Sequence, residues 1–146
     1  MLNTAKAILD ANKRTPVTIE GDATLLAAVK KMTEQRVGAV LIVGAGQKVT
    51  GIFTERDFAR LVATHEGDAL SMVVSAKMTR DVVTRGPNTQ VSNLKTLMNR
   101  GHFRHVPIVD ESEALIGMVS SGDVTKWERD DAREDAEAAS ELIRTA

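Results

Sequence analysis

The sequence predicts an α+β fold made of two pseudo-symmetric β-α-β-β-α modules that pack through their sheets. The main observation behind this prediction is an internal repeat, in which residues 17–59 recur without a gap as residues 83–125. Identities between the copies are few, but apolar, hydroxyl and acidic positions keep the same spacing, and self-similarity of this kind decides an architecture. The second observation is that strand-like and helix-like apolar periods follow in the same order in both copies. With 146 residues, the chain is long enough for two half-sized modules that stabilise each other.

The first copy begins with a short strand at residues 17–19 and a turn at residues 21–22. Asp22 is the expected N-cap of the helix that follows, because an aspartate side chain accepts hydrogen bonds from the free amides of a first helical turn. Apolar residues at helical spacing mark the face of this helix that we expect to be buried: Leu25, Ala28, Val29 and Met32.

A buried hairpin follows this helix. Residues 39–43 are all apolar, which is typical of a strand that is covered on both faces. The turn at residues 44–47 returns the chain as a second strand at residues 49–53, since two strands joined by so short a loop form a hairpin. After Asp57 we expect a second helix, whose apolar stripe is Phe58, Leu61 and Val62.

The second copy repeats this order. Its first helix follows a turn at residues 87–88, with Asn88 as the expected N-cap, and its hairpin turns at residues 110–113. The strand after that turn spans residues 115–119. The apolar residues that we expect on its helices are Val91, Leu94, Met98, Val124 and Trp127.

Three segments lie outside the repeats. We expect the residues before Val17 to complete the core of one module, and residues 68–78 to form a helix. The tail from Glu128 is charged nearly all round, and a helix that polar buries little by itself. It is either solvated or docked onto a partner subunit. We therefore divide the chain into a first repeat with its N-terminal segment (1–67), a linker helix with the second repeat (68–127), and a charged helical tail (128–146).

One motif recurs where a strand ends and a helix begins: Gly51, Thr54 and Asp57 in the first copy, and Gly117, Ser120 and Asp123 in the second. The glycine lets another group approach the backbone closely. The hydroxyl lies at a helix N-terminus, which favours a phosphate, and the carboxylate can accept two hydrogen bonds from a ribose diol. A hydroxyl and an aspartate at this spacing also form a helix-capping pair, which is the alternative role. The recurrence of the whole motif favours a ligand.

Charge distinguishes the two copies. Residues 77–105 contain six Lys or Arg and a single acid, and three charged or titratable residues fall within four positions: His102, Arg104 and His105. Guanidinium groups suit phosphate because they donate paired hydrogen bonds in a fixed plane. The matching positions 38 and 39 carry no charge. Two modules packed by pseudo-symmetry would form two related clefts, and we expect a phosphorylated ligand to prefer the cleft in which this basic segment lies with Asp57. The alternative is that the basic residues form a solvated face.

The composition excludes several classes of protein. A net charge of −1 argues against a partner that is a nucleic acid or a membrane surface. The lack of cysteine excludes disulfides and thiolate chemistry, and the three histidines lack the spacing of a metal site, so we expect no metal. The serines at positions 120–121 do not follow a nucleophile-elbow pattern, and we expect no enzyme activity. Because no membrane span or signal peptide is recognisable, we expect a cytoplasmic protein.

The repeated units, with the segments GIFTERDF, GMVSSGDV and FRHVPIVDE, resemble a tandem CBS-domain protein, or Bateman module, over residues 2–127. The resemblance implies a regulatory protein that requires no cofactor but binds adenine nucleotides (AMP, ADP or ATP) or, in some members, NAD or S-adenosylmethionine. It also implies two clefts, each of which combines the hydroxyl–aspartate motif of one repeat with strands of the other. The first cleft would use Thr54, Arg56, Asp57, Thr84, Arg104, His105, Val106 and Pro107. The second would use Thr18, Gly38, Ala39, Val40, Ser120 and Asp123.

Two functions are compatible with this sequence. The first is a sensor that binds an adenosine-containing ligand, with AMP favoured, and passes its occupancy to an unidentified effector protein. Asp57 would hold the ribose, Thr54 and Arg104 the phosphate, and backbone groups near Val106 the adenine, while a protonated His105 would strengthen phosphate binding below its pKa. The alternative is a ligand-free oligomerisation or interaction module. Pairs of this kind usually associate face to face, so we expect a homodimer.

Overall fold

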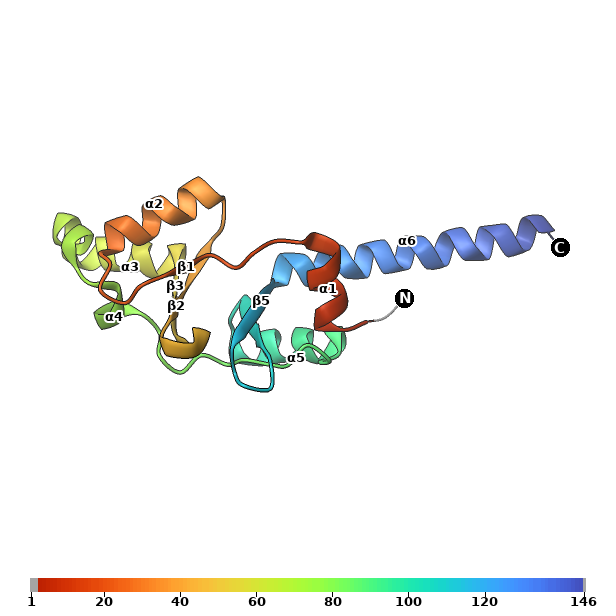
Figure 1. Cartoon of the computed structure of the whole chain (residues 1–146). Helices are drawn as coiled ribbons and strands as arrows, with labels where there is room; N and C mark the ends of the chain where they lie inside the picture. Colours follow the sequence, from red (N-terminus) through yellow and green to blue (C-terminus); the bar gives the residue numbers. More distant parts are fainter. Residues whose placement is uncertain (1–2, 146) are drawn as a thin grey trace.

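The computed structural model describes residues 3–145, which form two halves with the same order of elements (Figure 1). The first half contains β1 (Thr18–Ile19), α2 (Leu25–Gln35), β2 (Ala39–Val43), β3 (Val49–Thr54) and α3 (Glu55–His65). The second half contains α5 (Val91–Gly101), β4 (His105–Val109), β5 (Leu115–Ser120) and α6 (Ser121–Thr145). The other helical segments are α1 (Ala5–Asn12), η1 (Ala45–Gln47), η2 (Glu66–Ser71) and α4 (Val74–Lys77). The predicted α+β fold of two pseudo-symmetric modules is confirmed.

The hairpins of the two halves pair in the same register. Strands β2 and β3 pair antiparallel, as do β4 and β5, and Ala39 lies opposite Thr54 as His105 lies opposite Ser120. Strand β1 pairs in parallel with β2. Its counterpart in the second half is reduced to a bridge between Arg85 and Ile108. The first strand of the second copy is therefore shorter than the repeat predicts.

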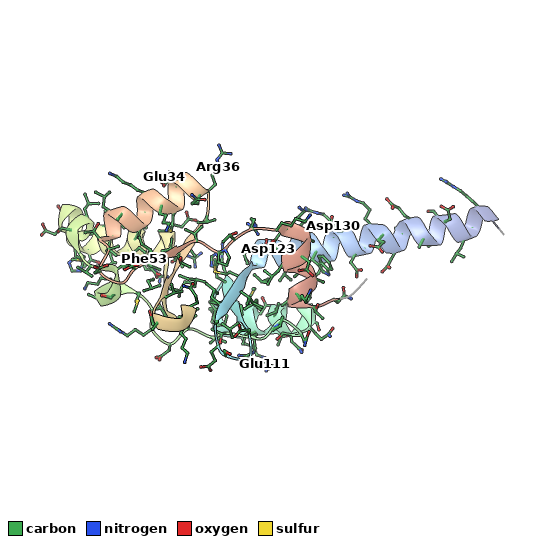
Figure 2. All side chains as sticks on the ribbon, in the orientation of Figure 1. Glu34, Arg36, Phe53, Glu111, Asp123 and Asp130 are labelled. Atoms are coloured by element: carbon green, nitrogen blue, oxygen red, sulfur yellow. The ribbon has the colours of Figure 1, made fainter. Side chains whose placement is uncertain are left out.

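Each half has its own hydrophobic core. The buried residues of the first core are Leu25, Ala28, Met32, Val40, Ile42, Phe53 and Val74. Those of the second core are Ala5, Ile8, Val91, Leu94, Met98, Val106, Ile108, Val119 and Val124. The predicted buried faces of α2 and α5 are therefore correct, whereas Val62 on α3 is 37% exposed. Phe53, labelled in Figure 2, is a fully buried side chain on β3.

Each half is completed by the segment that precedes the other half. Helix α1 packs on the second core, where the amide of Ala5 donates to the carbonyl of Thr89 (2.8 Å). The segment of α4 docks on the first half in the same way, with the amide of Val74 donating to the carbonyl of Ala23 (2.8 Å). The N-terminal segment, grouped by sequence with the first repeat, thus completes the core of the second. It supplies the apolar surface that an isolated second repeat would leave exposed.

The first helix of each half begins later than predicted. Thr24, and not Asp22, is the N-cap of α2, and its hydroxyl accepts a hydrogen bond from the amide of Ala27 at 3.1 Å. In the second half the N-cap position is held by Gln90 and not by Asn88, without a side-chain hydrogen bond. The delay has a physical cause: the carbonyls just before each helix accept hydrogen bonds from the docked segments, which holds the chain extended there.

Residues 68–78 do not form the single helix that their apolar pattern predicts. The chain forms the 3-10 turns of η2, becomes extended at Met72 and Val73, and then forms the single turn of α4. The break occurs because Val73 pairs with Thr24 as an isolated β-bridge, in which the carbonyl of Met72 accepts from the amide of Leu25 and the amide of Val74 donates to the carbonyl of Ala23. Tertiary pairing overrides local helix propensity here.

Helix α6 continues without a break from the second module into the charged tail and projects away from the body (Figure 1). Side chains from position 132 to 144 are exposed, including Leu142 (70%) and Ile143 (78%). Despite its length, neither α6 nor any other helix of the described part of the chain is apolar enough to cross a membrane.

Candidate functional site

The hydroxyl–aspartate motif caps a helix in both halves. At the start of α3, the hydroxyl of Thr54 accepts from the amide of Asp57 (3.1 Å), and a carboxylate oxygen of Asp57 accepts from the amide of Thr54 (3.0 Å). Ser120 and Asp123 make the same reciprocal pair at the start of α6, at 3.0 and 2.8 Å. The capping role is therefore real. It occupies one oxygen of each carboxylate and leaves the other for a further partner.

The second oxygen distinguishes the two motifs. Asp57 Oδ1 has no hydrogen-bond partner within residues 3–145. Asp123 Oδ1 accepts from Arg14 Nη2 in a salt bridge, and the Asp123 side chain is only 12% exposed. Figure 2 shows Asp123 at the start of α6, next to the segment that joins α1 to β1. Of the two motifs, the one in the first half therefore offers a free carboxylate oxygen.

A cavity of about 310 Å³ lies beside Asp57, between the two halves. The first half contributes residues from the end of β3 and the start of α3, among them Thr54 and Asp57. The second half contributes the residues before and at the start of β4, including Arg104 and His105, and the linker contributes residues 79–83 in part. The cavity therefore depends on the packing of one module against the other.

The cavity lining contains basic, acidic and apolar side chains. Three arginines, Arg56, Arg60 and Arg104, line it, and within the described chain none of them forms an ion pair. Apolar surface comes from Ile52, Val82, Val83 and Phe103, and negative charge from Glu55, Asp57 and Asp81. Unpaired guanidinium groups next to a free carboxylate oxygen and an apolar wall suit a ligand that carries an anion, hydroxyls and a flat apolar group.

Five of the eight residues predicted for the first cleft line this cavity: Thr54, Arg56, Asp57, Arg104 and His105. Val106 and Pro107 belong to the next positions of β4 and are buried in the interior. Val83 lines the cavity in place of its neighbour Thr84. The bridge between Arg85 and Ile108 has the same register as the pairing of Ile19 with Ile42, so the first strand of the second repeat is shortened but not shifted.

Sequence reasoning missed several lining residues. Arg60 lies one helical turn after Arg56 on α3, and that spacing on one helix face could have identified it. Thr79 and Asp81 come from the linker, whose path could not be read from the repeat. Gly38, which the sequence assigned to the second cleft, lines the first cavity, where a Cβ on it would lie 3.2 Å from the Glu55 carboxylate.

The remaining residues predicted for the second cleft lie in a more crowded place. Ala39 and Val40 are completely buried in β2, and the carbonyl of Thr18 accepts a hydrogen bond from Lys31 Nζ. Asp123 is covered by Arg14. These polar groups of the second cleft are therefore already satisfied by the chain's own cations.

His105 lies near both motifs. Burial lowers the pKa of its imidazole below the ordinary value, and the Arg104 guanidinium acts in the same direction, while the carboxylates of Asp123 and Glu55 oppose the shift. The imidazole therefore loses its proton at a lower pH than an ordinary histidine, which moves the predicted contribution of its charge toward more acidic pH. Its positive charge can assist an anion only at a more acidic pH.

The chain is similar to known proteins over most of its length. The CBS domain family model matches residues 7–64 and again residues 73–130. A curated relative, the mitochondrial CBS domain-containing protein CBSX3 of Arabidopsis thaliana, is 35% identical over 127 residues, which cover 84% of this chain and 61% of the relative. The chain thus spans about three fifths of that relative's length.

Solved structures give the same result. A CBS-domain containing protein from Agrobacterium tumefaciens is 37% identical with a TM-score of 0.81, and the match covers 86% of this chain and 98% of that one. A CBS domain pair in complex with 5′-methylthioadenosine and S-adenosyl-L-methionine is 25% identical (TM-score 0.76; 85% and 98% covered). A CBS domain protein of Pyrobaculum aerophilum complexed with AMP shares the fold at 24% identity (TM-score 0.74; 82% and 88% covered).

Proposed function

Because this chain belongs to the CBS-domain family as a tandem pair, we propose that it is a regulatory module that binds an adenosine-containing ligand in the cavity between its two repeats. Ligand-bound structures of the same fold support this class of function, since one carries AMP and another carries S-adenosyl-L-methionine with 5′-methylthioadenosine. The observation that carries the proposal is the combination of three unpaired arginines and the free Oδ1 of Asp57 in one cavity of the described chain.

The lining favours a phosphorylated nucleotide, AMP first among the candidates. Asp57 Oδ1 would accept hydrogen bonds from the ribose hydroxyls, and Arg104, with Arg56 or Arg60, would pair with the phosphate. The adenine would contact the apolar wall that includes Val83. The phosphate distinguishes AMP from adenosine at this site, because it is the group of the nucleotide that can pair with the arginines.

A panel of ligands tests this function directly. The full chain is heated with each of six compounds, and the shift of its unfolding temperature is measured: AMP, ADP, ATP, NAD, S-adenosylmethionine and adenosine. The affinity of any compound that stabilises the chain is then measured by titration calorimetry. A ligand at 100 times its Kd stabilises a protein by about 2.7 kcal/mol, which is easily measured. Stabilisation by AMP in preference to adenosine supports the proposal. The absence of stabilisation by every compound contradicts it.

The alternative function is an interaction module whose cavity stays empty. One observation favours it: the charged end of α6 projects from the body as an exposed helix, with Leu142 and Ile143 accessible at its end. A helix of this kind is available to a partner subunit or an effector protein. Partner binding through α6 does not by itself compete with ligand binding, because the cavity and the projecting helix lie in different parts of the molecule; the alternative differs only in that the cavity stays empty.

A further inference from the structure

Asp57 and Asp123 occupy equivalent positions of the two repeats and make the same capping hydrogen bonds. The second carboxylate oxygens of the two aspartates have different surroundings. Asp57 Oδ1 faces a cavity and has no partner in the described chain, whereas Asp123 Oδ1 accepts from Arg14. The difference between the two motifs is therefore an added cation and not an altered motif.

Arg14 reaches Asp123 because α1 packs on the second half. The core residues Ala5 and Ile8 anchor that helix, and the chain then crosses to β1 in the first half, past the start of α6. The Arg14 side chain is 56% exposed, but the carboxylate that it covers is only 12% exposed. A flexible guanidinium thus lies over a mostly buried carboxylate.

The matching arginine of the other half does not act in this way. Arg80 follows Arg14 at the spacing of the repeat, and its Nη2 donates to the carbonyl of Ser75 at 2.7 Å. It is bound to its own segment, and the Asp57 carboxylate remains open to the cavity. The two halves therefore contain the same pair of residue types, an arginine and a capping aspartate, in a closed and an open arrangement.

We propose that Arg14 closes a second nucleotide site: its guanidinium occupies the oxygen of Asp123 that would receive a ribose, and so restricts the pair to one adenine nucleotide. This inference rests on the proposed function of the first cavity. Because the Asp123 side chain is only 12% exposed, a ligand can reach its Oδ1 only after the guanidinium has moved away. Removing the guanidinium frees the oxygen without touching the capping hydrogen bonds of Ser120.

The test counts bound nucleotides. Equilibrium dialysis with radiolabelled AMP gives the number of molecules bound per chain for the parent, Arg14→Ala, the matched control Arg80→Ala and the double variant Arg14→Ala/Asp123→Ala. We expect one AMP for the parent, two for Arg14→Ala, one for Arg80→Ala and one for the double variant. An Arg14→Ala protein that is folded, by circular dichroism, and still binds a single AMP overturns the proposal.

The same series separates this inference from the proposed function. If the parent binds no AMP, the first cavity is not an AMP site, and the proposed ligand fails. A single AMP gained by Arg14→Ala, and lost again when Asp123→Ala is added, then supports the closure by Arg14 on its own. If Arg14→Ala also binds none, the closure is overturned as well.

Discussion

The side chain of Leu9 on α1 lies over Gly117 of β5, where a Cβ would come within 2.7 Å of Leu9 Cδ2. Met78 covers Gly51 in the first half in the same manner, with its Cγ 2.6 Å from the position of a Cβ. The glycine of each binding motif therefore serves the packing of a docked segment, and not the approach of a ligand.

We expect Gly117→Ala to destabilise the fold by about 1–3 kcal/mol, because an added methyl group overpacks the contact with Leu9. Chemical denaturation measures this change. Gly86→Ala is the control, since a Cβ there meets no atom within 4 Å. A Gly117→Ala protein as stable as the Gly86→Ala protein would show that α1 can shift without cost.

Asp57→Ala should weaken AMP binding by about 1.5–3 kcal/mol, the range for hydrogen bonds to a charged group. It also removes a helix-capping partner, which costs about 1 kcal/mol of stability. Asp123→Ala removes the equivalent cap together with the Arg14 ion pair and serves as the control, so both variants lose stability while only the first loses affinity. Titration calorimetry well below the unfolding temperature measures the affinity of each variant for AMP. Equal losses of affinity would remove the predicted asymmetry.

Arg104→Ala should raise the Kd for AMP by about tenfold or more and leave the affinity for adenosine unchanged, because in the proposed binding mode the guanidinium of this cavity residue pairs with the phosphate and with no other part of the nucleotide. Arg100→Ala, a change on α5 outside this cavity, is the control for general loss of positive charge. Titrations with AMP at two salt concentrations test whether the lost affinity is electrostatic, since the Kd for AMP should depend less on salt in Arg104→Ala than in the parent. A parallel loss of adenosine binding would place Arg104 elsewhere in the site.

The lowered pKa of His105 predicts a loss of stability in mild acid. The unfolded chain binds a proton at His105 from about pH 6.5 downward, while the folded chain does so only at lower pH, so the free energy of unfolding falls as pH falls between the two values. His105→Gln should flatten this dependence. Denaturation series at pH 7.5 and 5.5 test it, with the exposed His65→Gln as control. An unchanged slope in His105→Gln would assign the dependence to other groups.

We expect a homodimer in solution, with twice the 15.8 kDa mass of the chain. Two-fold association through one self-complementary patch is the commonest form of assembly. Light scattering at micromolar concentration measures the mass, and truncation after residue 130 shows whether the projecting part of α6 contributes. A particle with the mass of a single chain would contradict the prediction.

The architecture and part of the candidate site could be predicted from the order of the residues. The internal repeat identified both modules, the apolar periods identified the buried faces of α2 and α5, and the recurring motif located Thr54 and Asp57. These features are local, because periodicity and capping depend on residues a few positions apart.

The contacts that connect the two halves could not be predicted from residue patterns. That α1 completes the second core, that Arg14 covers Asp123, and that Asp81 and Arg60 join one cavity are contacts between segments far apart in the chain. The docked residues Leu9 and Met78 do not follow the spacing of the repeat, so an ungapped alignment of the two copies could not reveal them. Desolvation depends on the same packing, so the lowered pKa of His105 could not be predicted before its surroundings were known.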